Sequence, residues 1–340
     1  MTAKSTPGWS GSLPAFARKS LNVANRAAGY IDTIAAAKHT TTPAPIIVVG
    51  LPRSGTTLAY ELIVQAFDVA YLTRAYSYTF GMPNLTTRLT APRTRYPKAR
   101  YESDYGQIPG FFAPAENAVL WSKWFAEHAL LGHYFPSSYM TADAAADATA
   151  TIASMSTIAK RPFVFKNVYL TLSLPAFLQT LTKSRVIVVT REIDAIAASV
   201  FKKRRTLPAS AWWSICPPFV EHVSHDGIVE QTAFQCVRSK QILDHALALV
   251  DQERCMVVDY SKICAAPANF ISNVAHWTGN ELSRRADSDI PKHFDLSPSP
   301  GYPQEVADRF SKQSDALTAD RDQYLHRIEE YVRQHSETEL

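Results

Sequence analysis

"VVGLPRSGTTLAYELI", residues 48–63, is the stretch that decides the fold of this chain. Apolar residues lead into a loop framed by Gly50 and Gly55, and a helical apolar pattern follows. This order lets backbone N–H groups and a helix N-terminus converge on an anion. ATP-binding loops have a lysine where this chain has Thr56, and here Arg53 supplies a forked, permanently charged donor instead. The stretch predicts a phosphate or sulfate site and weakens the case for ATP or GTP hydrolysis. A glycine turn without a ligand is the alternative.

Four short runs rich in β-branched residues alternate with longer helical patterns. They are "PIIVVG" at 45–50, "PFVFK" at 162–166, "RVIVVT" at 185–190 and "CMVVDY" at 255–260. Such alternation is typical of a parallel sheet, and runs that are apolar on both faces indicate helices on both sides of it. The sequence predicts an α/β fold with a P-loop-like parallel sheet flanked by helices.

We expect one domain over residues 1–340. Within it, residues 1–44 form an N-terminal helical extension, and residues 68–161 form an inserted, mostly helical cap that holds the acceptor. Two helices are predicted in the cap, at "ENAVLWSKWFAEHALL" (116–131) and "TADAAADATATIASM" (141–155). The stretch 206–248 predicts further helices carrying Trp212 and Trp213.

The composition narrows the class of protein. With 46% hydrophobic and 19% charged residues, the chain is a folded globular protein. A net charge of +4 is too small to indicate nucleic-acid binding. The four cysteines lack CxxC spacing and are predicted to be reduced and mostly buried. No signal peptide or membrane span is evident, so a cytoplasmic location is expected. A basic amphipathic helix at 13–37 is expected to pack on its own domain, with contact to a membrane or partner as the alternative.

A second segment carries anion donors. "SRVIVVTREIDAIAASVFKKR", residues 184–204, places Arg191 at a strand end and Ser199 on the following helix, with Lys203 beyond it. Parallel strands present their carboxyl ends at one sheet edge, where open α/β folds bind ligands. The ligand should therefore carry two separated phosphate-like groups.

These segments resemble the sulfotransferases that use 3′-phosphoadenosine 5′-phosphosulfate (PAPS). "PRSGTT" resembles their 5′-phosphosulfate loop, and "TREIDAIAAS" resembles their 3′-phosphate segment. "FVFKNVYLTLSLPAFLQTL" is similar to their strand, lysine and helix element, and "VVDYSKICAAPANFISNVAHWTG" to their late strand with a tyrosine. The arginine in the loop resembles the bacterial branch and the tyrosylprotein sulfotransferases.

The resemblance implies a transferase that moves a sulfuryl group from PAPS to a hydroxyl or amine of a small or lipid-like acceptor, leaving adenosine 3′,5′-bisphosphate (PAP). It implies that the 5′-phosphosulfate is held by Arg53, Ser54, Gly55, Thr56 and Thr57. It implies that the 3′-phosphate is held by Arg191, Ser199 and Lys203, with Tyr260 as a weaker member of the site. No metal is expected, since cationic side chains and oriented amides can stabilise the charge of a sulfonate. The alternatives are a P-loop nucleotide kinase-like enzyme and a non-catalytic nucleotide-binding protein.

Three residues are candidates for catalysis. Arg53 and Lys166 would stabilise charge on the transferring group and the leaving phosphate, and the family has a catalytic lysine at the position of Lys166. The early glutamate of the tyrosylprotein branch has no counterpart after Asp68. The candidate base is therefore Glu116, expected to open a helix among Phe111, Phe112 and Trp121 and to lie across the sulfur from Lys166. A first-turn glutamate that favours the helix dipole is the alternative.

Other side chains stay open as the base or as metal ligands. The alternative bases are His128, His133, Glu102 and Asp104. The pair His222 and His225 has a spacing that suits a metal on one helix face, but solvent-exposed or structural histidines are far more common.

Overall fold

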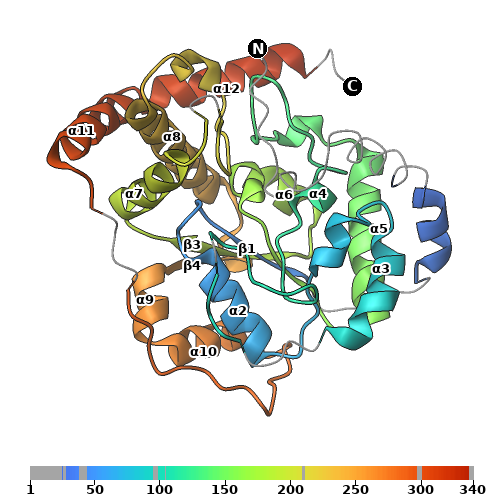
Figure 1. Cartoon of the computed structure of the whole chain (residues 1–340). Helices are drawn as coiled ribbons and strands as arrows, with labels where there is room; N and C mark the ends of the chain where they lie inside the picture. The colour runs from blue at the N-terminus through green and yellow to red at the C-terminus, as the bar shows by residue number, and fades with distance from the viewer. Residues whose placement is uncertain are drawn as a thin grey trace.

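The computed structural model describes residues 25, 28–37, 44–94, 99–103, 105–208, 211–296 and 301–336. Its centre is a sheet of four parallel strands in the order β2-β1-β3-β4, which are β1 (Ile46–Val49), β2 (Val164–Lys166), β3 (Arg185–Thr190) and β4 (Cys255–Asp259). The strands lie within the four apolar runs, and helices flank the sheet (Figure 1). The predicted α/β fold is confirmed.

The sheet separates two hydrophobic layers because successive side chains of a strand point to opposite faces. In β1, Ile47 and Val49 pack into one layer, and Ile46 and Val48 pack into the other. The first layer is completed by the helices α5 (Ala142–Ala159), α6 (Leu174–Thr180), α7 (Ile193–Arg204), α8 (Ile228–Leu249), α11 (Gln304–Ala319) and α12 (Arg321–His335). The second is completed by α2 (Thr56–Ala66), α9 (Tyr260–Ala265) and α10 (Pro267–Trp277).

Strand β4 differs from the other three. The side chains of β1 and β2 are all buried, whereas Val257 in the middle of β4 is 50% exposed. The expectation that helices cover both faces of all four strands is wrong for β4, whereas β2, the other edge strand of the sheet, is buried.

The segment 68–161 is more irregular than its sequence pattern indicates. It contains the helices α3 (Pro83–Thr90), α4 (Ala118–Trp121) and α5, together with short 3₁₀ turns. The helix predicted at 116–131 is reduced to the four residues of α4. Asn117 starts it in the left-handed region, with φ 46°, and Trp121 and Trp124 are fixed by core packing instead of by a helical repeat.

Two other predicted helical stretches, the one carrying Trp212 and Trp213 and the one at 13–37, have different outcomes. Trp212 and Trp213 precede α8 and lie outside any helix. Residues 28–35 are helical, but residues 13–24, 26 and 27 of the predicted N-terminal helix lie outside the described residues. The four cysteines are free and buried, and burial raises the pKa of Cys216 and of Cys236 to about 12. Within the described ranges, every helix is too short or too polar to cross a bilayer.

Candidate active site

The loop between β1 and α2 adopts a conformation that requires its glycines. Gly50 and Gly55 have φ angles of 151° and 98°. A Cβ on Gly50 would lie 2.4 Å from the carbonyl oxygen of Val189, and a Cβ on Gly55 would lie 2.2 Å from the Tyr260 ring. The two glycines therefore let the loop pass directly over β3 and against α9.

The N-terminus of α2 opens into the pocket at this loop. Gly55 is the N-cap, no side chain of the described residues caps the helix, and its first turn holds no acidic residue. The first amides of a helix have no partner within the helix, and its N-terminus carries a partial positive charge. Thr56 and Thr57 line the pocket beside them. These features fit an anion such as a phosphate or a sulfonate.

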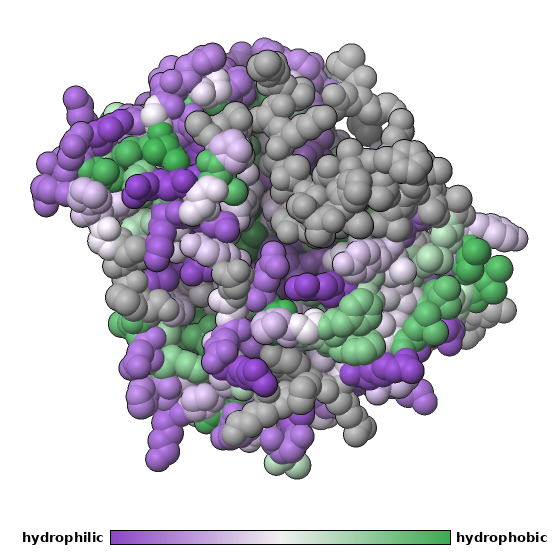
Figure 2. Space-filling model, in the orientation of Figure 1, coloured by the Kyte–Doolittle hydropathy of each residue, from purple (hydrophilic) through white to green (hydrophobic). Residues whose placement is uncertain are grey.

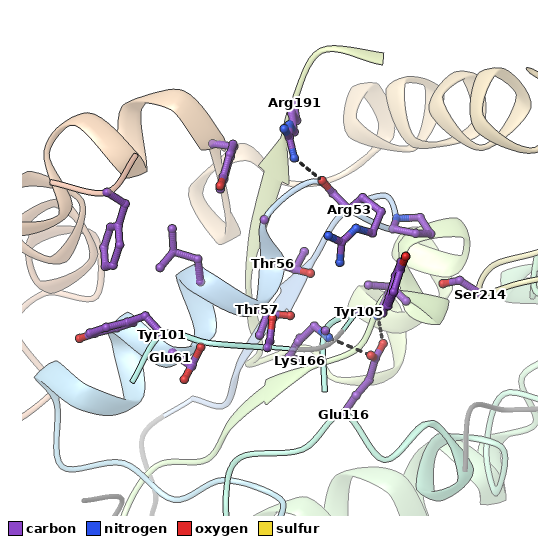
Figure 3. A pocket seen from close by; sticks show the side chains of 18 of the residues that line it. Arg53, Thr56, Thr57, Glu61, Tyr101, Tyr105, Glu116, Lys166, Arg191 and Ser214 are labelled. Carbon is purple, nitrogen blue, oxygen red and sulfur yellow. Dashed lines mark hydrogen bonds and ion pairs between the residues drawn. The ribbon is translucent and has the colours of Figure 1, made fainter. Parts of the chain in front are cut away.

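Three segments meet at the carboxyl edge of the sheet (Figure 3). Arg53, whose φ is 70°, donates from Nε to the hydroxyl of Ser199 on α7 at 2.8 Å. Arg191, which follows β3, donates from Nη1 to the Arg53 carbonyl oxygen at 3.2 Å. The Arg191 guanidinium also lies 4.7 Å from the centre of the Tyr260 ring. The two segments that the sequence predicts to hold separate phosphate groups are thus joined through Arg53.

An aromatic wall faces these cations. The guanidinium carbon of Arg53 lies 5.2 Å from the centre of the Tyr105 ring, and Lys203 Nζ lies 4.3 Å from it. Trp213 packs edge-on against the same ring at 5.7 Å. Tyr105 therefore places a π face beside two of the predicted phosphate-binding cations.

Glu116 and Lys166 form an ion pair in the same pocket. Lys166 Nζ lies 2.9 Å from Glu116 Oε2, and the backbone N–H of Val168 donates to Glu116 Oε1 at 2.6 Å. The lysine side chain is only 4% exposed. A buried ammonium needs a close partner, and the carboxylate meets that need. The two groups lie side by side in an ion pair. The expectation that they face each other across the transferring sulfur is therefore wrong.

The prediction that Glu116 lies among Phe111, Phe112 and Trp121 is also wrong. Phe111 and Phe112 are exposed and pack against each other at 5.1 Å, and Trp121 is turned into the core against Phe165. Glu116 precedes the N-cap of α4, so it is not a first-turn residue of that helix. Its environment is made by hydrogen-bond donors instead of aromatic rings.

Of the alternative bases that the structure describes, His128, His133 and Glu102 are not among the residues that line the pocket. His133 is engaged on both ring nitrogens, because Nε2 pairs with Glu127 at 2.8 Å and Nδ1 accepts from the backbone N–H of Cys216 at 2.7 Å. His128 packs edge-on against Tyr331 at 5.6 Å. Glu102 is exposed, and Asp104 lies outside the described residues.

The histidine pair considered for a metal is on the surface. His222 packs against Arg327, whose Nη2 lies 2.9 Å from His222 Nε2, and His225 is exposed. A permanently charged guanidinium this close opposes a cation. Among the residues that the structure describes, no group of three or more His, Cys, Asp or Glu side chains could hold a metal ion.

Most of the site residues predicted from the sequence line one pocket, namely Arg53, Gly55, Thr56, Thr57, Glu116, Lys166, Arg191 and Tyr260. Three others are behind or beside it. Ser54 belongs to the loop but its side chain is fully buried, and its hydroxyl has no hydrogen-bond partner among the described residues. Ser199 contributes through Arg53, and Lys203 through Tyr105.

The sequence analysis did not predict other residues of the pocket, among them Glu61, Tyr101, Tyr105, Trp213, Ser214, Phe294 and Asp295. Glu61 had a signal, since it is a carboxylate inside an apolar helical stretch, and it is 2% exposed. Burial, with the nearby carboxylate of Glu61, raises the pKa of Tyr101. Phe294 packs edge-on against Tyr101 at 5.0 Å and belongs to no motif.

The chain is similar to a known family and to solved structures. The model of the sulfotransferase family matches residues 45–284. Sulfotransferase STF1 from Mycobacterium tuberculosis H37Rv aligns with a TM-score of 0.50 and 14% identity, over 87% of this chain and 82% of that chain. Sulfotransferase STF9 from Mycobacterium avium aligns with a TM-score of 0.47 and 14% identity, over 91% of this chain and 79% of that chain. At these identities the likeness to STF1 concerns the fold alone. No curated protein matches the chain.

Proposed function

Because this chain belongs to the sulfotransferase family, we propose that it moves a sulfuryl group from PAPS to a hydroxyl or amine of a small or lipid-like acceptor. The observation that carries the proposal is the convergence of anion donors on one pocket that also contains a paired lysine and glutamate. The donor and the acceptor class are inferred from this chemistry and from the family.

The residues at the sheet edge suit a donor with two anionic groups. The amides at the start of α2, with Arg53, Thr56 and Thr57, suit the 5′-phosphosulfate. Arg191 suits the 3′-phosphate, because its guanidinium can form two parallel hydrogen bonds to one phosphate. When bound, PAPS supplies the sulfuryl group and an adenosine bisphosphate leaving group.

Lys166 and Glu116 would divide the proton and charge chemistry. The acceptor oxygen bonds to sulfur and gives its proton to Glu116, while the bond from sulfur to the bridging phosphate oxygen breaks. Lys166 stabilises negative charge on the transferring oxygens and, through its ion pair, orients the carboxylate of Glu116. The backbone N–H of Val168 fixes the second carboxylate oxygen, so that the base meets the acceptor in one orientation.

Binding and transfer measurements test the proposal. Isothermal titration calorimetry should show binding of PAP and no comparable binding of ATP with magnesium. Transfer of ³⁵S from labelled PAPS to a panel of phenols, alcohols and amines should yield a labelled product. Preferential binding of ATP with magnesium would point to a kinase-like enzyme. Binding of PAP without transfer to any member of a broad panel would point to a nucleotide-binding protein that has no transferase activity.

A further inference from the structure

The helix at residues 28–35 is attached to the domain by its polar groups. Asp32 is buried, and it accepts hydrogen bonds from Asn84 Nδ2 at 2.8 Å and from the backbone N–H of Leu85 at 2.9 Å, both on α3. Arg88 Nε donates to the carbonyl oxygen of Ala35 at 2.7 Å. The Ala37 N–H donates to Ser154 Oγ on α5 at 2.8 Å. The side of this helix that faces the protein is therefore held by hydrogen bonds.

The opposite side of the helix is apolar. Tyr30, Ile31 and Ile34 are 78%, 53% and 74% exposed, and Leu89 on α3, next to Arg88, is 60% exposed. Figure 2 shows hydrophobic atoms along the edge where Figure 1 draws this helix in dark blue. We name these four residues the N-terminal apolar face. A surface helix of a globular protein normally turns its apolar side inward and its charges outward. Here the arrangement is reversed, and clustered exposed apolar residues mark an interaction site.

The positive charge of the extension, residues 1–44, favours an anionic partner. Residues 1–44 contain five Lys or Arg residues and a single acidic residue, Asp32. Because Asp32 is buried against α3, the extension offers positive charge and no exposed carboxylate. The remainder of the chain carries 30 basic and 30 acidic residues, so the whole net charge of +4 resides in the extension. The family match begins at residue 45, after it.

We propose that the N-terminal apolar face docks this protein on an anionic membrane surface. Exposed tyrosine, isoleucine and leucine side chains enter the boundary between headgroups and acyl chains, and the net positive charge of the extension favours an anionic surface. The buried attachment of Asp32 to α3 keeps the apolar side turned outward and couples the membrane to the catalytic domain. The catalytic residues take no part in this contact.

Vesicle binding tests the proposal on the full chain without using transfer activity. The protein should co-sediment with phosphatidylcholine vesicles that contain phosphatidylglycerol, and less with pure phosphatidylcholine. Raising the salt concentration from about 0.05 to about 0.5 M should weaken vesicle binding, because it shortens the Debye length and screens the attraction between charges. The double variant Ile31→Ser and Ile34→Ser should lower the partition coefficient by about tenfold or more.

Matched controls separate docking from general stickiness and from misfolding. Leu249 and Leu296 are 64% and 57% exposed and lie in other parts of the chain, so Leu249→Ser with Leu296→Ser should bind vesicles as the wild type does. Both double variants should keep the wild-type melting temperature. Equal vesicle binding by the Ile31 and Ile34 double variant, or no binding by the wild type, would overturn the proposal. A wild-type dimer in sedimentation velocity that this variant dissociates would assign the face to a second copy instead.

Discussion

The pocket has two walls of different construction, and under the proposed function we assign the donor to one and the acceptor to the other. One wall is the carboxyl edge of the sheet, where Arg53, Arg191 and Tyr260 follow β1, β3 and β4. The register of parallel strands fixes these positions relative to one another, since each strand is hydrogen-bonded to its neighbour. This wall carries the cations and helix amides that suit a constant, highly charged donor.

The other wall is irregular chain from the segments 101–103, 105–117 and 213–214. Tyr101, Tyr105, Asn117 and Ser214 all have positive φ angles, between 46° and 65°. Left-handed non-glycine residues are uncommon and cluster at binding sites. Such a wall is held by side-chain contacts instead of a ladder, and under the proposed function we assign the acceptor to it.

The ion pair of Lys166 and Glu116 connects the two walls, because the lysine ends β2 and the glutamate belongs to the irregular segment. Because the pair joins both walls, we expect substitutions in it to cause the largest losses of activity. We expect Lys166→Ala and Glu116→Gln each to lower kcat by about 10² to 10⁴. PAP affinity should change little in the glutamine variant. Steady-state kinetics with an unactivated alcohol and calorimetry with PAP provide the measurements.

The acidity of the acceptor separates the two roles. A nitrophenol should partly rescue Glu116→Gln, because its hydroxyl needs less help to lose a proton, and it should not rescue Lys166→Ala. Glu102→Gln, an exposed change outside the pocket lining, is the control and should retain wild-type kcat. Near-normal kcat of Glu116→Gln on an unactivated alcohol would remove the glutamate from the mechanism.

The sheet-edge wall is broken most directly at Gly55. Alanine there would meet the Tyr260 ring at 2.2 Å with φ at 98°, so Gly55→Ala should cost about 2 to 5 kcal/mol of unfolding free energy and weaken PAP binding. Gly279→Ala is the matched control, since Gly279 has φ 64° and nothing within 4 Å of a built Cβ. Urea unfolding gives the loss of unfolding free energy for each variant, which combines steric collision and backbone strain in Gly55→Ala and reports backbone strain alone in Gly279→Ala. Equal losses would show that the contact with Tyr260 is unimportant.

Arg191 tests whether the sheet-edge wall has a separate 3′-phosphate position. Arg191→Ala should weaken PAP binding much more than binding of adenosine 5′-phosphosulfate, which lacks the 3′-phosphate. A lost charged hydrogen bond costs about 1.5 to 3 kcal/mol, so we expect about a tenfold effect or more by calorimetry. Ser199→Ala should weaken binding of both ligands, because its hydroxyl accepts a hydrogen bond from Arg53 Nε. Lys202→Ala, an exposed change on the same helix, should leave both affinities unchanged. Equal losses for the two ligands in Arg191→Ala would refute the separate position.

The smallest expected effect concerns the support beneath the loop. Thr171 Oγ1 accepts from the N–H of Gly50 at 3.0 Å and donates to its carbonyl oxygen at 2.9 Å, in a buried position. Thr171→Val should leave these backbone groups unpaired and cost about 1 to 3 kcal/mol. Thr180→Val is the control, because among the described residues that buried hydroxyl bonds to the carbonyl of Ala176 alone, within its own helix. Thermal unfolding should rank Thr171→Val as the less stable of the two.

The sequence by itself determined the sheet and the wall that the sheet carries. Apolar runs and a glycine loop are local patterns, and parallel pairing then brings their ends to one edge without further information. The strand runs, the loop, Arg191 and Lys166 could therefore be identified before the structure was known.

Only the tertiary structure decided the other wall and the pairing across the pocket. The helix expected at 116–131 fails because Trp121 and Trp124 are fixed by distant core partners, which override local propensity. Glu116 meets Lys166 across 50 positions of sequence, and Trp213 meets Tyr105 across 108. Contacts of this kind depend on how the whole chain packs, and no spacing within a single segment encodes them.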